Sequence, residues 1–119
     1  MSIKLLLVED NEDDRQGFRQ SVDRFNHEKG TEISIVECKT LDDALGQIDR
    51  SFDGAVIDMK LGDKGGEGNE ILKRVDEWNL RMPIVVLTGT PSEADHAYVH
   101  IEVQKKGEAD NLVILEDFR

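Results

Sequence analysis

Several polar side chains in the sequence have the chemistry needed to handle a phosphoryl group. Three carboxylates and one hydroxyl stand at or directly after the end of an apolar run: Glu9, Asp10, Asp58 and Thr88. Two lysines follow a further, shorter apolar run: Lys105 and Lys106. Carboxylates bind divalent cations, and a hydroxyl and an ammonium group can hold phosphoryl oxygens while charge moves. The chemistry depends on whether the fold brings these groups together.

The elements that would position these groups follow from hydrophobic periodicity. Short, almost continuous apolar runs are typical of parallel strands covered on both faces. Such runs predict strands at residues 3–8, 33–36, 54–57, 84–87 and 101–103. Apolar residues at helical spacing predict helices at about 13–27, from 41 to 48, from about 69 to 78, and at 109–119. A further short helix is expected at 91–99.

Local signals refine these elements. Gly30 is expected to end the first helix, and Thr40 is expected to cap the second. The spacing of the third helix turns Trp78 inward with the other apolar residues. The lone Cys38 cannot form an internal disulfide, and its neighbours suggest a core or half-buried thiol.

Strands that alternate with helices predict a parallel sheet with helices on both faces. In such a sheet, ligands collect beyond the carboxyl ends of the strands. Each acid alone is better explained as a helix cap or a solvated turn, and Asp10 and Asp13 are both candidate caps. The joint pattern favours a site instead, because the acids end different strands. Clustered carboxylates stay ionised with a compensating cation, and oxygen ligands favour Mg²⁺ or Mn²⁺.

The 119-residue chain has a formal net charge of −11, from 26 acidic and 15 basic residues. This charge argues against binding to nucleic acid or to anionic membranes. No apolar run is long enough to span a bilayer, and the first residues do not resemble a signal peptide, so we expect a cytoplasmic protein. Nothing marks a second domain, so residues 1–119 are expected to form one.

Four motifs in order resemble the response-regulator receiver domain, and the resemblance covers roughly residues 3–118. The matching segments are LLLVEDN at 5–11, AVIDM at 55–59, GNE at 68–70 and PIVVLTG at 83–89. The resemblance implies a flavodoxin-like (βα)5 doubly wound parallel sheet with strand order 2-1-3-4-5. The same order follows if Asp10, Asp58 and Thr88 are to meet. It also implies a phosphorelay protein rather than an enzyme in the ordinary sense.

The resemblance assigns a role to each site residue. Asp58 would be the phosphoacceptor, with Glu9 and Asp10 as the acidic pair that holds Mg²⁺ or Mn²⁺. Lys60 would lend its backbone carbonyl to the metal, and Thr88 would be the switch hydroxyl. One of two lysines would contact the phosphoryl group, and the sequence does not decide between them: Lys105 and Lys106.

The sequence departs from the family pattern after Thr88. The interval to the two lysines is shorter than usual, which predicts a shortened or irregular fourth helix. The aromatic switch position holds Glu102 or Val103, and Tyr98 is either a displaced substitute or a packing residue. The chain also ends early in its last helix, which indicates a domain truncated there.

Three functions compete. The first is a phosphoacceptor that receives its phosphoryl group from a histidine kinase or phosphotransfer protein and switches contact with a downstream protein, as a monomer or weak dimer. The second is an atypical receiver-like protein-binding module that phosphorylation does not control. The third, an aspartyl-phosphate phosphatase, needs a second acid two residues after the nucleophile, where this chain has Lys60.

Overall fold

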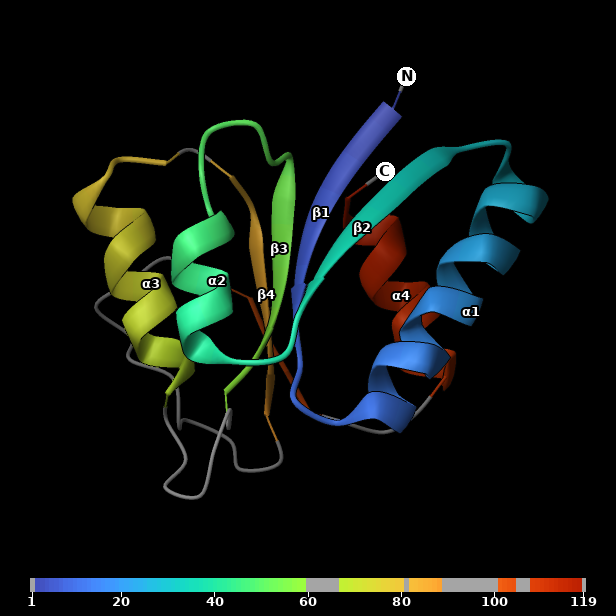
Figure 1. Cartoon of the computed structure of the whole chain (residues 1–119). Coiled ribbons are helices and arrows are strands. Elements are labelled where there is room, and N and C mark those ends of the chain that lie inside the picture. Colours follow the sequence, from blue (N-terminus) through green and yellow to red (C-terminus); the bar gives the residue numbers. More distant parts are fainter. Residues whose placement is uncertain (1, 60–66, 81, 89–100, 105–107, 119) are drawn as a thin grey trace.

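A five-stranded parallel sheet lies at the centre of the structure, a computed structural model that describes residues 2–59, 67–80, 82–88, 101–104 and 108–118 (Figure 1). The strands are β1 (Ser2–Val8), β2 (Glu32–Cys38), β3 (Gly54–Asp58), β4 (Ile84–Thr88) and β5 (Ile101–Gln104). Their order is β2-β1-β3-β4-β5, and every neighbouring pair is parallel. The predicted sheet and strand order are confirmed.

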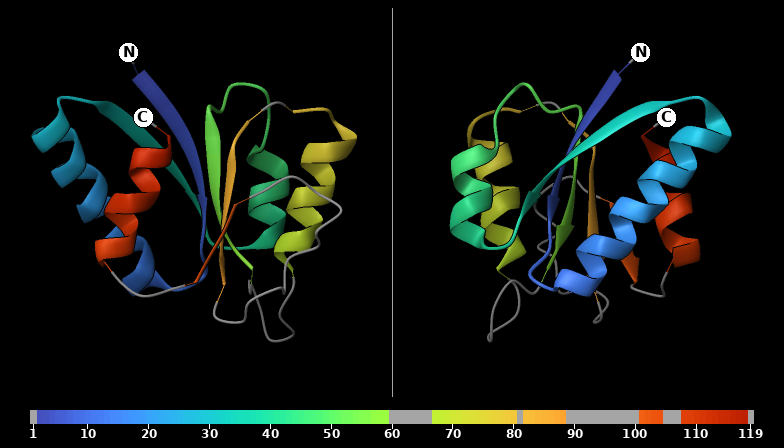
Figure 2. Two further views of the ribbon diagram at one scale, coloured as in Figure 1. Left: turned by 180° about the vertical axis from the view of Figure 1, so that it is seen from behind. Right: turned by 45° about the vertical axis from the view of Figure 1, so that its right-hand side comes forward.

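Helices cover both faces of the sheet. They are α1 (Glu12–Lys29), α2 (Leu41–Gln47), α3 (Gly68–Glu77) and α4 (Glu108–Asp117). Figures 1 and 2 show α2 and α3 together on one face and α1 with α4 on the other. The helix α4 corresponds to the last helix expected from the sequence. The short helix expected at 91–99 lies outside the described residues, so the shortened or irregular fourth helix stays a prediction.

Side chains from the two faces of β1, β2, β3 and β4 enter two separate apolar cores. In β1, Leu6 and Val8 join the core under α2 and α3, whereas Leu5 and Leu7 join the core under α1 and α4. All four side chains are almost completely buried. Because both faces are covered, the strands are apolar without alternation, as the sequence showed. In the part of the chain that the structure describes, no helix is long and apolar enough to cross a membrane.

The predicted helix ends are largely confirmed. Thr40 caps α2, because its hydroxyl accepts a hydrogen bond from the Asp43 backbone N–H at 3.1 Å. Gly30 ends α1 in the left-handed region, with φ 67°. The cap of α1 is Asn11, whose side-chain oxygen accepts from the backbone N–H of Asp14 at 3.0 Å. Asp10 is therefore not the cap of α1 and is available for another role.

The prediction that Trp78 turns inward is wrong. Its side chain is 46% exposed, and its ring stacks against the Arg74 guanidinium, 4.6 Å from the ring centroid. The helix α3 ends in a Schellman motif, with Asn79 at φ 52° and the Leu80 backbone N–H donating to the Val75 carbonyl at 3.0 Å. This turn carries Leu80, two residues further on, into the core.

Cys38 is a buried thiol at the end of β2, and we expect it to resist alkylation until the protein unfolds. Burial, together with the negative charge of Asp43, raises the pKa of Cys38 to about 11, so the reactive thiolate is scarce at pH 8 to 9. Alkylation rates measured by mass spectrometry should be low in buffer and rise sharply in unfolding concentrations of urea. Equal rates under both conditions would contradict this burial.

Candidate functional site

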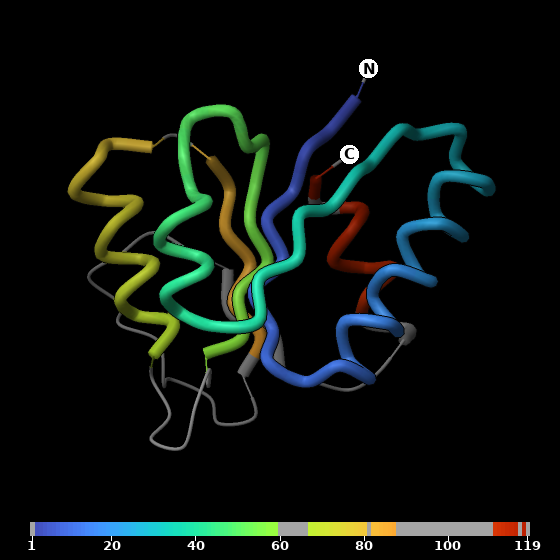
Figure 3. The backbone as a smooth tube through the Cα atoms, in the orientation of Figure 1, coloured from blue at the N-terminus to red at the C-terminus, as the bar shows by residue number. Residues whose placement is uncertain are grey.

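Three acidic side chains converge at the carboxyl edge of the sheet. The register pairs Val8 of β1 with Ile57 of β3, so the next residues along each strand, Glu9 and Asp58, lie side by side. One carboxylate oxygen from each of Glu9, Asp10 and Asp58 lies within 4.8 Å of the others. Figure 3 shows the end of β1 turning into α1 beside the end of β3. The structure thus brings together the three acids singled out in the sequence.

The backbone around Glu9 and Asp10 is held by hydrogen bonds on either side. Glu9 and Asp58 are each only 3% exposed, whereas Asp10 is exposed. The backbone N–H of Glu9 donates to the Cys38 carbonyl at 3.0 Å, which extends the β1–β2 ladder by one residue. A carboxylate oxygen of Glu9 accepts from the backbone N–H of Asn11 at 3.2 Å. The β1–α1 connection is therefore fixed at both its backbone and its side chains.

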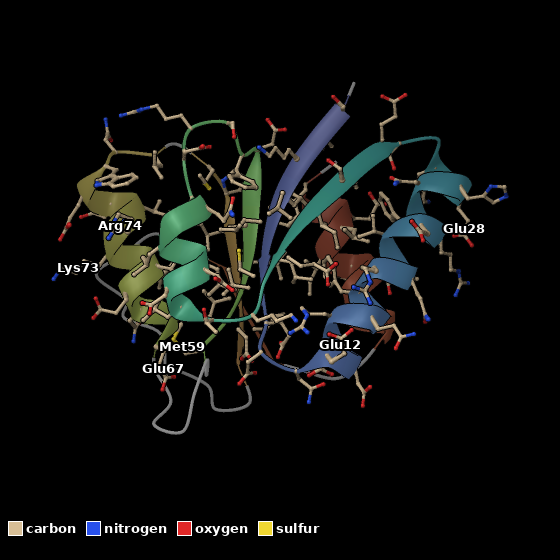
Figure 4. All side chains as sticks on the ribbon, viewed as in Figure 1. Glu12, Glu28, Met59, Glu67, Lys73 and Arg74 are labelled. Atoms are coloured by element: carbon tan, nitrogen blue, oxygen red, sulfur yellow. The ribbon has the colours of Figure 1, made fainter. Side chains whose placement is uncertain are left out.

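The end of β3 is held from two sides. The Met59 backbone N–H donates to the Leu87 carbonyl of β4 at 2.9 Å, and the Met59 carbonyl accepts from the Gly68 N–H at 3.0 Å. This second bond anchors the start of α3 against the strand, and Figure 4 shows Met59 near Glu67 at that end of the helix. Asp58 therefore sits on backbone that is fixed by neighbouring strand and helix.

The remaining predicted site residues are only partly described. Thr88 is the last residue of β4 and pairs in register with Gln104 of β5, one residue beyond the Leu87 that pairs with Asp58. The backbone of Thr88 thus ends its strand at the same edge as the acids. Its side chain lies outside the described part of the structure, and so do three other predicted residues: Lys60, Lys105 and Lys106.

The donor set fits a hard divalent cation. All three side chains offer carboxylate oxygens, which are the ligands that Mg²⁺ and Mn²⁺ prefer. Two of the three are buried, so their negative charges are shielded little by water and repel one another. A cation bound between the oxygens would offset that repulsion. Glu9, Asp10 and Asp58 are the residues that would hold it.

Sequence reasoning missed Arg15, a buried neighbour of these acids. This arginine of α1 is 3% exposed, and its Nη1 donates to the Glu9 carbonyl at 2.8 Å. Its Nη2 bonds a carboxylate oxygen of Glu12. One usable signal was present in the sequence, namely Glu12 three positions before Arg15 at the start of the predicted helix. That signal predicts an exposed ion pair and not a buried contact with the β1–α1 connection.

A hollow of about 720 Å³ lies at the opposite edge of the sheet, where the strands begin. It is lined by Asp49, Arg50, Ser51, Glu77, Trp78 and Leu80. Parallel α/β sheets bind their ligands at the carboxyl ends of the strands, so the acidic cluster is the candidate site.

Gly68 gives a direct test of how tightly α3 packs against β3, the strand that carries Asp58. A Cβ at Gly68 would lie 3.1 Å from the Asp58 carbonyl oxygen and 3.1 Å from the Met59 Cα, and backbone atoms cannot easily move away. We expect Gly68→Ala to lower the free energy of unfolding by about 1–3 kcal/mol, as other overpacked sites do. Gly17→Ala is the matched control, because nothing lies within 4 Å of that added carbon. It should stabilise the helix by about 0.5–1 kcal/mol. Urea unfolding curves measure both, and a stabilised Gly68→Ala protein would refute the close contact.

Comparison with solved structures agrees with this architecture. A response regulator receiver domain from Methylobacillus flagellatus superposes with a TM-score of 0.73, at 19% identity over 100% of both chains. A response regulator receiver domain protein from Bacillus halodurans gives a TM-score of 0.75 at 14% identity, covering 100% of this chain and 98% of the other. The signal receiver domain of an HD domain-containing protein from Pseudomonas fluorescens gives 0.72 at 16%, covering 98% and 94%.

No protein-family model matches the sequence, and no curated protein matches it significantly. The likeness is therefore carried by structure, over essentially the full length of the chain. The strand order and the helices on both faces agree with the fold of the solved receiver domains. The chain has the fold of the response-regulator receiver domain.

Proposed function

We propose that this chain is a phosphoacceptor of two-component signalling, which takes a phosphoryl group onto Asp58 from the phosphohistidine of a kinase or phosphotransfer protein. The observation that carries the proposal is the position of Asp58. It is a buried carboxylate at the end of a central strand, with the carboxylates of Glu9 and Asp10 within 4.8 Å. That arrangement stands in a receiver fold, at the edge where α/β sheets bind ligands.

The chain's own groups account for the transfer. An oxygen of Asp58 forms the new bond to phosphorus while the phosphorus–nitrogen bond of the donor breaks, and the imidazole nitrogen keeps the electron pair. Glu9 and Asp10 would hold Mg²⁺ or Mn²⁺ beside the nucleophile. The cation, when bound, supplies positive charge that attracts the donor and offsets charge on the moving group. Hydrogen bonds at Met59 keep Asp58 from moving away from its neighbours.

The resemblance supplies the remaining roles. The backbone carbonyl of Lys60 would complete the protein ligands of the cation. The hydroxyl of Thr88 and the ammonium of Lys105 or Lys106 would bind phosphoryl oxygens. The new phosphoryl group adds close to two negative charges. Attraction of the Thr88 hydroxyl toward it would repack residues 89–100, and a downstream protein would bind the altered surface.

A receiver-like binding module that phosphorylation does not control is the second candidate. Two features of the sequence favour it, namely the short interval between Thr88 and the lysines, and the absence of an aromatic residue at Glu102 or Val103. Retention of all three acids favours the phosphoacceptor. The two functions differ in whether Asp58 accepts a phosphoryl group.

Phosphorylation of Asp58 is tested with acetyl phosphate and Mg²⁺, followed by intact mass spectrometry. The wild-type protein should gain one phosphoryl group, and Asp58→Asn should gain none because the nucleophile is lost. Asp10→Asn should need more Mg²⁺ for the same labelling. The exposed helix residue Asp23 provides a control, since Asp23→Asn makes the same chemical change away from the site and should label normally. Undiminished labelling of Asp58→Asn would assign the phosphoryl group to another residue, and an unlabelled wild type would favour the binding module.

Alanine substitutions of Thr88, Lys105 and Lys106 test which of these residues bind the phosphoryl group. We expect Thr88→Ala and one lysine variant to lose the change in hydrogen exchange that the phosphate mimic beryllofluoride causes at 89–100. The other lysine variant should respond like the wild type. A solvated lysine contributes at most about 1 kcal/mol to stability, so both lysine variants should unfold near the wild-type urea concentration. A normal response in both would remove the lysines from the mechanism.

A further inference from the structure

A ring of four charged side chains, of which Arg15 is buried, lies next to the acidic site. Arginine is seldom fully buried without partners, yet Arg15 of α1 is 3% exposed. Its Nη2 bonds Glu12, and its Nε lies 3.6 Å from a carboxylate oxygen of Glu37 on β2. Arg19, one turn further along α1, is bound to the same two acids. Its Nη1 donates to both oxygens of Glu37 at 2.9 Å, and its Nη2 lies 3.5 Å from Glu12.

The four charges cancel within the ring, which ties the start of α1 to the edge strand β2. Glu12 and Glu37 therefore stay paired with arginines and add little net negative charge beside Glu9 and Asp10.

Only Arg15 extends from this ring into the candidate site. Its Nη1 donates to the carbonyl oxygen of Glu9 at 2.8 Å, in a buried position. That carbonyl belongs to the peptide group that joins Glu9 to Asp10. A peptide group is planar, so holding its oxygen fixes the direction in which both residues leave the backbone. This hydrogen bond therefore restrains ψ of Glu9 and φ of Asp10, and with them the positions from which the two side chains start.

We propose that Arg15 is a positioning residue, which orients the Glu9–Asp10 peptide so that both carboxylates face Asp58 and bind the divalent cation together. This inference rests on the proposed function. Arg15 touches neither the cation nor the phosphoryl group; it acts through the Glu9 carbonyl. Partners of this kind behind the ligands change metal affinity by about 10- to 100-fold when they are removed.

Lysine substitutions separate position from charge. Arg15→Lys keeps the positive charge but cannot reach Glu9, Glu12 and Glu37 at once, because lysine lacks the planar fork of donors. Arg19→Lys is the matched control, since Arg19 shares both acids, while the hydrogen bond to the Glu9 carbonyl comes from Arg15. Calorimetric titration with Mn²⁺ should show that Arg15→Lys binds the ion at least about tenfold more weakly than the wild type. Arg19→Lys should stay within about fivefold of the wild type, as for an exposed ion pair.

Neutral substitutions give effects of opposite sign under the two explanations. Removing a positive charge near a cation site should strengthen cation binding if charge alone matters. We expect this mild strengthening, or no change, for Arg19→Gln. Arg15→Gln removes the same charge but should weaken Mn²⁺ binding, because the Glu9–Asp10 peptide is released. Tighter binding by Arg15→Gln would overturn the proposal.

A readout without metal isolates the backbone effect. The amide resonance of Asp10, measured by NMR in metal-free protein, should shift in Arg15→Lys and stay near its wild-type position in Arg19→Lys. The Asp10 amide belongs to the very peptide whose oxygen Arg15 holds. An unmoved Asp10 amide in a folded Arg15→Lys protein would overturn the proposal.

If the Arg15 variants fail to fold, Glu12→Asp decides the question. Glu12 is exposed and keeps its charge in this variant, but the shorter side chain withdraws from the Arg15 guanidinium. The control is Glu28→Asp, in which the same change is made to an acid paired with Arg24. Figure 4 shows Glu12 and Glu28 at opposite ends of α1. Mn²⁺ binding should weaken in Glu12→Asp alone, and equal binding by both variants would refute the role of Arg15.

The outcomes also separate this inference from the proposed function. A wild-type protein that neither binds Mn²⁺ nor gains a phosphoryl group on Asp58 overturns the proposed function, and the positioning role with it. A wild type that does both, with Arg15→Lys indistinguishable from Arg19→Lys, overturns only the role of Arg15.

Discussion

Electrostatic repulsion among three clustered carboxylates is the constraint on which the rest of this structure depends. Two of the acids, Glu9 and Asp58, are buried, where water screens their charges poorly. Left to relax, the side chains and their backbone would move apart. Strand pairing resists this, because the β1–β3 register and the backbone bonds at Glu9 and Met59 fix where each acid leaves the sheet. The fold thus holds the charges in an arrangement that a divalent cation would stabilise.

The two apolar cores make this arrangement rigid. Because α2 and α3 cover one face and α1 and α4 the other, β3 and the second half of β1 are buried and cannot tilt without disturbing a packed core. Acids at the ends of such strands are positioned more accurately than acids on loops. Gly68 extends the same principle to α3, whose first residue lies against the Asp58 carbonyl with no room for a side chain. Rigid packing at this end of the sheet is therefore what allows like charges to be held so close.

The sequence predicted the sheet and the acidic cluster because both follow from local patterns. Glu9, Asp10 and Asp58 each end an apolar run, and parallel strands place such ends at one edge. Trp78 was predicted wrongly, since helical spacing does not reveal that a left-handed Asn79 ends α3 and puts Leu80 in the core. The role of Arg15 could not be predicted, because this residue of α1 pairs with Glu37 of β2, which is distant from it in the sequence. Local pattern gives strand ends, whereas the contacts behind the site are set by tertiary packing.

The ring of Arg15, Arg19, Glu12 and Glu37 explains how α1 can begin with Glu12 so close to an anionic site. Acids in the first turn stabilise a helix, and this helix has Glu12, Asp13 and Asp14 there. All three would add to the repulsion around Glu9 and Asp10. The two arginines pair with Glu12 and with Glu37 of β2, so these two acids add little net charge beside the site. The helix is capped separately by Asn11, which accepts from the Asp14 backbone N–H. Stabilisation of the helix and control of charge at the site are thereby achieved by the same residues, and one of them also holds the Glu9 carbonyl.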